Sequence, residues 1–188
     1  MDELIQPVKS PFASNSVPAD KNNWMTPPEI FAALDAEFGF YLDAAATFES
    51  TLCPYWLSYQ DNALSCDWQS YGAVWCNPPY DNPLPWVQKA AEQCPIQKQP
   101  VVMLLPSDTS TAWFNYGRET ADEIRFITGG RLSFIHPVTR KPGKNGNSKG
   151  SVFFIWRPWI TPRRIVTFTD RDKLMNDGRE LLSEVMAA

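Results

Sequence analysis

The sequence predicts an α/β fold built on a doubly wound, mostly parallel sheet that ends in an antiparallel strand. The first observation is a pair of short apolar runs bounded by prolines or glycine, at residues 73–76 and 101–106, which is typical of strands buried on both faces. The second is the alternation of such runs with helix-like segments, which is typical of crossover connections. The third is a last apolar run, residues 151–156, which we expect to close the sheet as the antiparallel strand. A chain of 188 residues suffices for one domain with a substantial core.

Three regions are expected along the chain. Residues 1–21 mix proline, serine and small residues without apolar periodicity, so we expect a flexible amino-terminal tail. Residues 22–160 carry the folded domain. Residues 161–188 form an extension that begins with a basic stretch and continues as an amphipathic helix.

Composition predicts a soluble cytoplasmic protein without a metal. No stretch approaches the roughly 20 apolar residues of a membrane helix, and the acidic amino terminus does not resemble a signal peptide. Four cysteines are widely spaced and His136 is the single histidine, which is too few ligands for a zinc site. We therefore expect reduced thiols and no bound metal.

The charge is unevenly distributed. Net charge is −4, yet residues 126–169 contain no Asp or Glu and hold eight of the seventeen basic residues, which leaves −12 on the remainder. A basic face of this kind can bind a polyanion although the whole chain is acidic. The alternative is a solvated basic loop without a partner.

The first expected helix begins near residue 26. Thr26 as the cap and Pro27 at the first helical position precede an apolar face at Ile30, Phe31 and Leu34. Taken as structure alone, this is a capped surface helix.

Residues 40–47 predict a strand that runs into a loop of small residues. Ala44 and Ala45 would let a ligand approach the backbone closely, and Asp43 could pair with an α-amino group. The alternative is that the alanines open a helix. Further on, Asp61 lies just before the central strand.

Asn77-Pro78-Pro79-Tyr80 follows the central apolar run, at the carboxyl end of a strand, where open α/β sheets bind ligands. The Asn77 side chain and the Pro78 carbonyl offer two acceptors for the two hydrogens of a planar NH2 group. Tyr80 offers a flat face for a base. The alternative is a polar turn that ends a strand.

Downstream elements continue the alternation. A helix begins near residue 84, residues 101–106 form a strand, residues 107–110 cap a further helix, residues 123–127 form a strand, and residues 129–134 turn back over the site. Residues 139–150 form a glycine-rich basic loop, in which we expect Arg140, Lys141, Lys144 and Lys149 to contact DNA phosphates.

These segments together resemble the phage-type DNA N-6-adenine methyltransferases, a small Dam-like family. The strongest element is Asn77-Pro78-Pro79-Tyr80, a form of the (Asp/Asn/Ser)-Pro-Pro-(Tyr/Phe/Trp) motif of amino-methyltransferases, and the second is Trp24-Met25-Thr26-Pro27. The resemblance covers roughly residues 24–156. It implies a Rossmann-like class I methyltransferase fold and a phage or prophage protein working in the cytoplasm of a bacterial host.

The resemblance also implies roles. S-adenosyl-L-methionine would be the methyl donor, held by Thr26, Pro27, Asp43, Ala44, Ala45 and Asp61, with Glu49 a weaker candidate for the ribose. The acceptor would be N6 of an adenine flipped out of double-stranded DNA, with Asn77, Pro78, Pro79 and Tyr80 as the catalytic residues. Transfer would be direct and in line, without metal. The usual glycines near Asp43 are missing from this sequence.

Two alternative functions are compatible with the sequence. The same tetrapeptide occurs in methyltransferases that act on RNA adenine or on a protein glutamine amide, because an amide NH2 presents the same two hydrogens. A catalytically silent DNA-binding module with this fold is the reading from another class.

Overall fold

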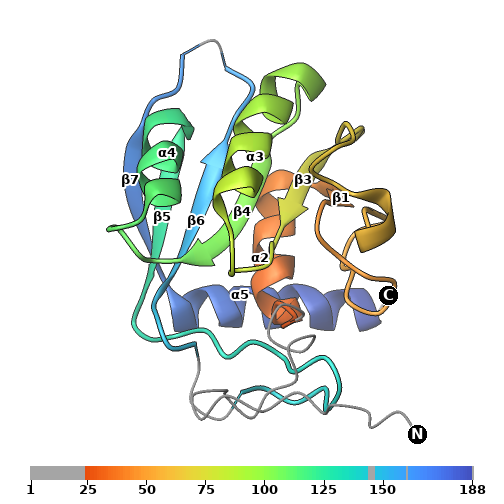
Figure 1. Ribbon diagram of the computed structural model, residues 1–188. Helices are drawn as coiled ribbons and strands as arrows, with labels where there is room; N and C mark the ends of the chain where they lie inside the picture. The colour runs from red at the N-terminus through yellow and green to blue at the C-terminus, as the bar shows by residue number, and fades with distance from the viewer. Residues whose placement is uncertain (1–23, 144–146, 160, 188) are drawn as a thin grey trace, which may run out of the picture.

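The computed structural model describes residues 24–143, 147–159 and 161–187, and it contains a seven-stranded sheet in the order β2-β1-β3-β4-β6-β5-β7 (Figure 1). The strands are β1 (Phe40–Asp43), β2 (Tyr55–Trp56), β3 (Ala73–Cys76), β4 (Val101–Pro106), β5 (Glu123–Thr128), β6 (Ser151–Trp156) and β7 (Ile165–Asp170). Neighbouring strands pair in parallel except at β6, which is antiparallel to both β4 and β5. The predicted α/β class, with its mostly parallel sheet, is confirmed. The predicted flexible tail, residues 1–21, lies outside the described residues.

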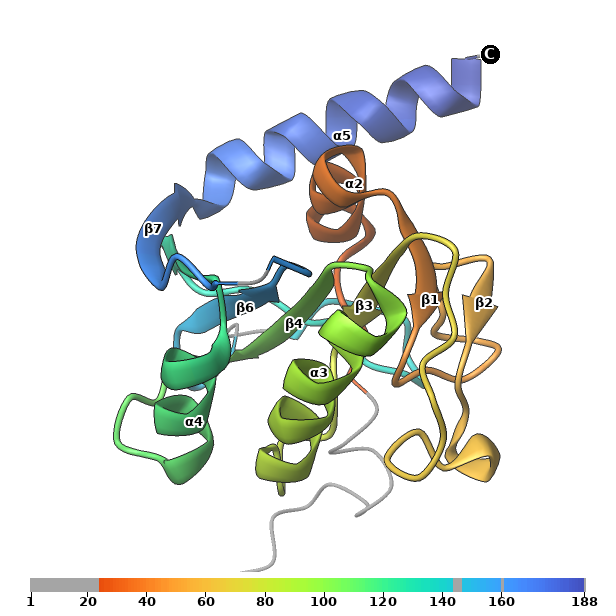
Figure 2. The same cartoon turned by 90° about the horizontal axis from the view of Figure 1, so that it is seen from above.

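Helices cover both faces of the sheet (Figure 2). They are α2 (Pro28–Phe38), α3 (Leu84–Gln97), α4 (Ala112–Thr120) and α5 (Arg171–Ala187), with a short 3-10 turn, η1 (Tyr59–Asp61). Figure 2 shows α3 and α4 on one side and α2 and α5 on the other. Alternate β4 residues divide between two cores because successive side chains of a strand point to opposite faces. Met103 packs with α3 and α4, whereas Leu104 packs with α2 and α5.

Two helix starts differ from the prediction. Thr26 does not cap α2: Pro27 takes the cap position, Pro28 is the first helical residue, and the buried Thr26 hydroxyl has no hydrogen-bond partner. The helix α4 is capped by Thr111, whose hydroxyl accepts from the Phe114 N–H at 3.3 Å, and not by residues 107–110. Two consecutive prolines before α2, and several serine and threonine residues between 107 and 111 before α4, let each start shift by one or a few residues.

The carboxyl-terminal region adds a strand that the sequence analysis did not anticipate. After the basic stretch, β7 joins the sheet parallel to β5, and the expected helix begins only at Arg171. Helix α5 then crosses α2 closely at Gly178. A Cβ atom at that position would lie 1.9 Å from the Glu29 carbonyl oxygen.

Residues 131–143 and 147–150, here called the cover segment, run past the carboxyl ends of the parallel strands (Figure 1). Isolated bridges join Ile135 to Met25 and to Pro142, and the Leu132 and Phe134 side chains of the segment are buried in the core. The segment thus turns back over the sheet edge, as predicted for residues 129–134. Its position places it above the site.

Three negative findings apply to the described residues. None of their helices is both long and apolar enough to cross a bilayer. No group of three or more His, Cys, Asp or Glu side chains among them is arranged to hold a metal ion. All four cysteines are free thiols.

Candidate active site

A cavity of about 890 Å³ lies where the sheet predicts it, at the carboxyl ends of β1 and β3. Its volume falls in the range of small-molecule sites. Among the residues predicted to act, it is lined by Thr26, Asp43, Ala45, Asn77, Pro79 and Arg140. The structure therefore gathers residues that lie up to 114 positions apart in the chain around one space.

Asn77 is fixed by two hydrogen bonds. Its Nδ2 atom donates to the Trp24 carbonyl oxygen at 3.1 Å, and its Oδ1 atom accepts from the Tyr80 hydroxyl at 3.0 Å. Because a carbonyl oxygen can accept but cannot donate, the Trp24 carbonyl must face the NH2 end of the Asn77 amide, which fixes the orientation of that amide. An amide oxygen has two lone pairs, and the Tyr80 hydroxyl uses one of them. The second is available to a substrate N–H.

Tyr80 is anchored from the other side as well. Its hydroxyl also lies 3.3 Å from the Leu104 carbonyl oxygen, and its ring packs edge-on against Phe134, with centroids 6.2 Å apart. Burial raises the pKa of the Tyr80 phenol well above its usual value, so the hydroxyl stays protonated. Tyr80 and the buried Pro78 do not themselves line the cavity, whereas Asn77 and Pro79 do.

Asp43 is a buried carboxylate in the cavity wall, with 3% of its surface exposed. Burial raises the pKa of its carboxyl from 3.8 to about 7, although backbone N–H groups of Ala45 and Leu52 act to lower it. The Ala45 N–H lies 3.2 Å from Oδ1. Among the described residues, no Lys, Arg or His side chain forms an ion pair with Asp43. The site therefore offers an acidic group to a cation that the chain does not supply.

The other predicted cofactor residues divide into two groups. Thr26 and Ala45 line the cavity, whereas Pro27 and Ala44 do not, and the Thr26 hydroxyl is buried without a hydrogen-bond partner. Asp61 does not line the cavity either. Its carboxylate accepts from the Ser58 N–H at 2.7 Å and from the Ser58 hydroxyl at 2.6 Å, which lowers its pKa.

Several lining residues were missed by sequence reasoning. They include the aromatic side chains of Trp24, Tyr59, Trp75 and Trp86 and the neighbours of Asp61 at Ser58, Gln60 and Asn62. The position of Trp24, two residues before Thr26, was the signal that could have suggested its role. No local pattern marks Trp86, which comes from the first turn of α3.

The matches with known proteins agree with this architecture. A family model described as DNA N-6-adenine-methyltransferase (Dam) matches residues 13–181. The chain belongs to this family. It is 41% identical over 159 residues to the DNA N-6-adenine-methyltransferase of Escherichia phage T1, a match that covers 77% of this chain and 66% of that protein, just under two thirds. It is 36% identical over 147 residues to the protein of the same name from Haemophilus phage HP1 (strain HP1c1), covering 77% of this chain and 84% of that protein.

Members of a DNA N-6-adenine-methyltransferase family need a methyl donor, and the cavity suits a cationic one. The chemical observations are the buried Asp43 carboxylate without a cationic partner and the Thr26 hydroxyl without any partner. An ammonium or sulfonium group would satisfy the first, and a polar group of the same ligand would satisfy the second. The residues present therefore fit S-adenosyl-L-methionine.

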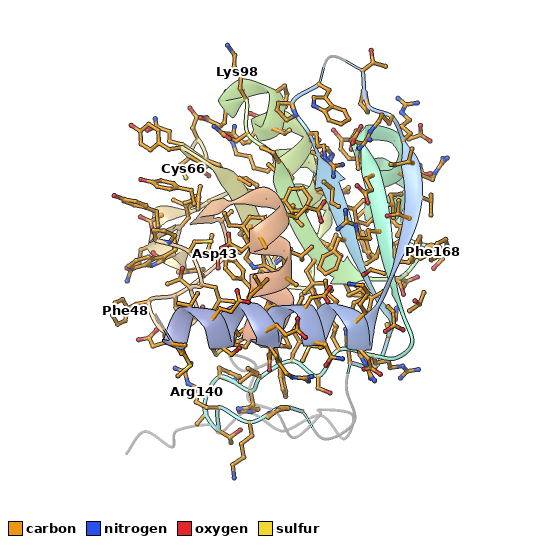
Figure 3. The ribbon with its side chains drawn as sticks, turned by 180° about the vertical axis from the view of Figure 1, so that it is seen from behind. Asp43, Phe48, Cys66, Lys98, Arg140 and Phe168 are labelled. Carbon is orange, nitrogen blue, oxygen red and sulfur yellow. The ribbon has the colours of Figure 1, made fainter. Side chains whose placement is uncertain are left out.

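The basic residues of this Dam-family chain do not form one face. Arg140 lines the cavity, where its guanidinium donates to the Glu49 carbonyl oxygen at 3.0 Å and contacts the Met25 sulfur (Figure 3). Lys149 forms an ion pair with Asp108, which lowers the pKa of that carboxyl to about 2. Lys141 is exposed, and Lys144 lies outside the described residues.

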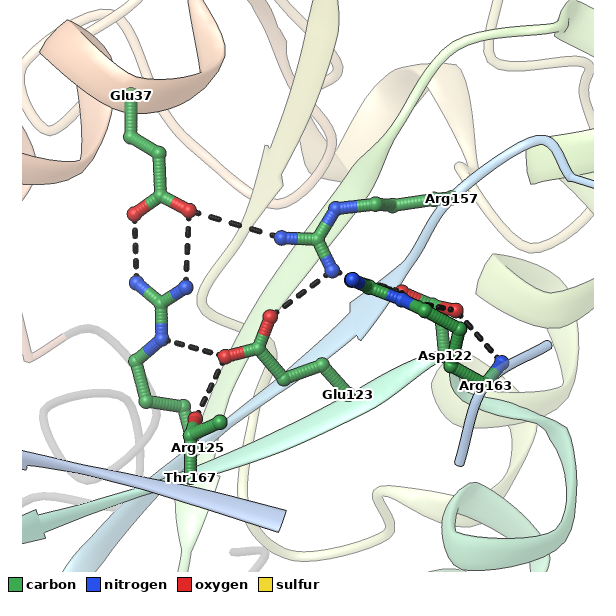
Figure 4. Close-up of polar contacts among 7 residues, drawn as sticks. All are labelled: Glu37, Asp122, Glu123, Arg125, Arg157, Arg163 and Thr167. Carbon is green, nitrogen blue, oxygen red and sulfur yellow. Dashed lines mark hydrogen bonds and ion pairs between the residues drawn. The ribbon is translucent and has the colours of Figure 1, made fainter. Parts of the chain in front are cut away.

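Two further arginines of the acid-free stretch lie at the opposite edge of the sheet. The ends of β6 and β4 pair there, at Trp156 and Val101, so the following Arg157 is far from the carboxyl ends of the parallel strands. Arg157 and Arg163 join Glu37, Asp122, Glu123 and Arg125 in one ion-pair network (Figure 4). Burial acts to raise the pKa of Asp122, but hydrogen bonds from Arg163 and Arg157 outweigh it and lower the pKa. The expected basic face is thus wrong for these two residues, since acids distant in sequence neutralise them.

Proposed function

We propose that this chain transfers a methyl group from S-adenosyl-L-methionine to N6 of an adenine in double-stranded DNA. The observation that carries the proposal is the juxtaposition of the oriented Asn77 carboxamide oxygen and the buried Asp43 carboxylate around one cavity. One group accepts from an amine, and the other attracts a cation. Membership of the DNA N-6-adenine-methyltransferase family supports the choice of adenine in DNA over RNA adenine or a protein amide.

Asn77 and the Pro78 carbonyl would hold the two hydrogens of the adenine amino group. An aryl amine is a poor nucleophile because its lone pair is conjugated with the ring. Gripping both hydrogens favours a pyramidal nitrogen, which directs the lone pair at the donor. Because Trp24 and Tyr80 hold the Asn77 carboxamide in position, the acceptor needs little reorganisation when the amine arrives.

The remaining proposed roles concern binding. Tyr80 is the proposed stacking surface for the flipped base, which offsets part of the few kcal/mol that base flipping costs. Because its ring does not line the cavity, this role requires the ring to become accessible when the base enters. Asp43, Thr26 and Ala45, which line the cavity, hold the donor, whose role when bound is to supply the methyl group. Pro27, Ala44 and Asp61 are assigned to donor binding as well, although they do not line the cavity. Arg140, Lys141, Lys144 and Lys149 approach the DNA backbone. The protein would act in the cytoplasm of a bacterial host.

Transfer is proposed to be direct and in line, without a covalent enzyme intermediate. Among the described residues that line the cavity there is no cysteine to act as a nucleophile. Burial also raises the pKa of the nearby Cys76 thiol, which keeps it protonated and unreactive.

The test is incubation of DNA with donor labelled in the methyl group, followed by nucleoside analysis. N6-methyladenine is the expected product. Asn77→Ala should lower the rate by about 100-fold or more, by analogy with the loss of one oriented polar group at a reacting centre. Asn115→Ala, which removes an asparagine from the exposed side of α4, is the matched control and should leave the rate unchanged.

Other outcomes would overturn the proposal. Near-normal turnover by Asn77→Ala would remove the amine-binding role. Label that appears in RNA or protein but not in DNA would show that DNA is not the acceptor. Absence of donor binding in calorimetry would favour a silent DNA-binding module.

A further inference from the structure

The strand β7 is an edge that the described chain leaves open. The sheet ends at β7, which pairs only with β5 and keeps an unbroken register from Ile165 to Asp170. Natural edge strands are usually protected by proline, lysine, a bulge or a covering element. β7 contains no proline or lysine, and its pairing with β5 shows no bulge.

Apolar side chains project from this edge strand. Val166 is 56% exposed and Phe168 is 69% exposed, and Figure 3 shows Phe168 at the margin of the molecule. One side of the Phe168 ring stacks on Phe126, with centroids 5.9 Å apart and planes 26° from parallel. The other side is open. Two apolar residues on one face of an uncovered edge are typical of a surface that associates.

The backbone of the edge has a defined hydrogen-bonding pattern. The Ile165 N–H donates to the Asp122 carbonyl oxygen at 3.0 Å, and the Thr169 carbonyl oxygen accepts from the Thr128 hydroxyl at 3.2 Å. Residues 165 and 169 therefore bond toward the β5 side. Because residues of a strand alternate in the side toward which they bond, the N–H and C=O groups of Val166 and Phe168 point to the free edge. A partner strand must match these two residues.

We propose that β7 pairs antiparallel with β7 of a second copy of this chain, around a twofold axis at Thr167. In this register Val166 of each copy lies opposite Phe168 of the other, and each such pair exchanges both of its backbone hydrogen bonds. The two side chains lie on the same face of the joined sheet, so each valine covers the open side of the other copy's ring.

Charge complementarity favours a second copy of the chain as the partner. Arg164 immediately precedes β7 in a left-handed backbone conformation, and in this register it lies at the end of the paired strands, near Asp170 of the other copy. Its side chain is 59% exposed and makes a long contact, 4.0 Å, with Glu119, whereas Asp170 is exposed and accepts from the Lys173 N–H at 2.9 Å. A shift by two residues would instead set Val166 opposite Asp170, or Phe168 opposite Arg164. A shift by one residue would set outward-pointing backbone groups against inward-pointing ones.

The arrangement is isologous, as a closed dimer requires. A pairing of one six-residue strand with another is small, so we expect a dimer that dissociates at low protein concentration. Because the strands run antiparallel, the two cavities face in opposite directions. The dimer itself does not depend on the proposed function. That its two sites would meet separate DNA segments rests on that function.

Sedimentation of the full chain at rising concentration tests the association. The expected result is a reversible shift from the monomer mass to twice that mass. Val166→Lys and Phe168→Lys should each keep the chain monomeric over the same range. Lys173→Ala, at an exposed position of α5, is the control and should dimerise normally.

Disulfide cross-linking tests the register. In a Cys66→Ser background, which removes the half-buried cysteine, Thr167→Cys should form a cross-linked dimer on mild oxidation. Residues opposite each other on the axis form a non-hydrogen-bonded pair with Cα atoms about 4.5 Å apart, within disulfide reach. Thr169→Cys lies off the axis and should not cross-link.

Either measurement can overturn the proposal. A monomer at every concentration rules out the dimer, and a dimer that persists in Phe168→Lys places the contact elsewhere. Equal cross-linking of Thr167→Cys and Thr169→Cys rules out the register. Circular dichroism of each variant checks that the fold is intact, and methylation of DNA is a separate assay whose failure would concern only the proposed function.

Discussion

The surroundings of Asn77 favour asparagine over aspartate at this position. The general motif allows aspartate at this position, but the Trp24 carbonyl lies 3.1 Å from Nδ2 and requires a donor there. An aspartate would set two acceptors face to face. At the scale of single residues, the surroundings of a motif therefore decide which of its permitted members can work.

Asn77→Asp should consequently impair the reaction although the variant still matches the motif. We expect a loss of about 10-fold to 100-fold, which corresponds to about 1–3 kcal/mol for an unsatisfied buried polar group. Repulsion from the Trp24 carbonyl should raise the pKa of the new carboxyl, so the loss should be larger at pH 8 than at pH 6. Single-turnover rates at the two pH values measure this. An unchanged rate at pH 8 would contradict the role given to Trp24.

Asp43 should make donor binding depend on pH. Its carboxyl has a pKa of about 7 in the folded protein, because burial disfavours the charged form. A cationic donor favours that charged form, so below pH 7 binding must release a proton. Affinity for S-adenosyl-L-methionine should therefore rise by up to about tenfold per pH unit between about pH 5.5 and 7.

Calorimetry in two buffers of different ionisation enthalpy measures both the affinity and the proton released. Asp43→Asn should bind weakly and without this pH dependence. The raised pKa also means that Asp43 lowers the stability of the free protein as pH rises from about 4 to 7, because the folded state binds more protons than the unfolded state in that window. A donor affinity that is flat with pH in the unsubstituted protein would remove Asp43 from the binding site.

At the scale of elements, some parts of the fold follow from sequence and others do not. Strands β3 and β4 were predicted because each is buried on both faces and reads as a continuous apolar run. β7 was missed because none of its six residues is buried, so its alternation of apolar residues and threonine carries no core signal. The end of α3 is not evident from sequence either, because Pro95 lies inside its last turn.

Helix crossing is another feature that sequence does not reveal. Gly178 reads as a helix-weakening residue in α5, and only the packing shows that its missing side chain lets α5 approach the Glu29 carbonyl of α2. Gly178→Ala should therefore destabilise the protein by about 1–3 kcal/mol, although alanine favours helices, because the backbone cannot move aside.

Thermal unfolding measures this change, with an expected fall in Tm of several degrees, about 2–8 °C. Ser183→Ala, at an exposed position of the same helix, is the control and should change stability by less than about 0.5 kcal/mol. A Gly178→Ala protein as stable as the unsubstituted one would show that the two helices are not in close contact.

At the scale of the whole molecule, charge position matters more than charge count. Arg157 and Arg163 are neutralised by Glu37 of α2, by Asp122 just before β5 and by Glu123 of β5, at the sheet edge opposite the cavity. Sequence analysis could count the cations of the stretch but could not identify partners that come from other parts of the chain. The candidate site was better predicted because Asn77 and Asp43 each follow a recognisable strand, whereas Arg140 needed the folded cover segment to reach the cavity.

DNA affinity should accordingly fall with salt less steeply than the eight cations suggest. With at most five of them near the cavity, a plot of log affinity against log salt should have a slope no steeper than about −5. Lys141→Gln should make the slope shallower by about 1. Arg164→Gln, which removes an exposed cation at the opposite edge, should leave it unchanged. Filter binding across a salt series distinguishes these results, and a slope near −7 would mean that the distant arginines also reach DNA.

The junction between β7 and α5 has a consequence for how the protein is handled. Arg171 donates to the Arg131 carbonyl at 3.3 Å, and both Gly129 and Gly130, which lead into the cover segment, lie against Asp170 and Arg171. The start of α5 thus supports the cover segment from behind. Trimming the chain after Trp156, where the recognisable motifs end, would leave every residue of the proposed site in the sequence and yet remove the contacts that hold the cover segment over the cavity.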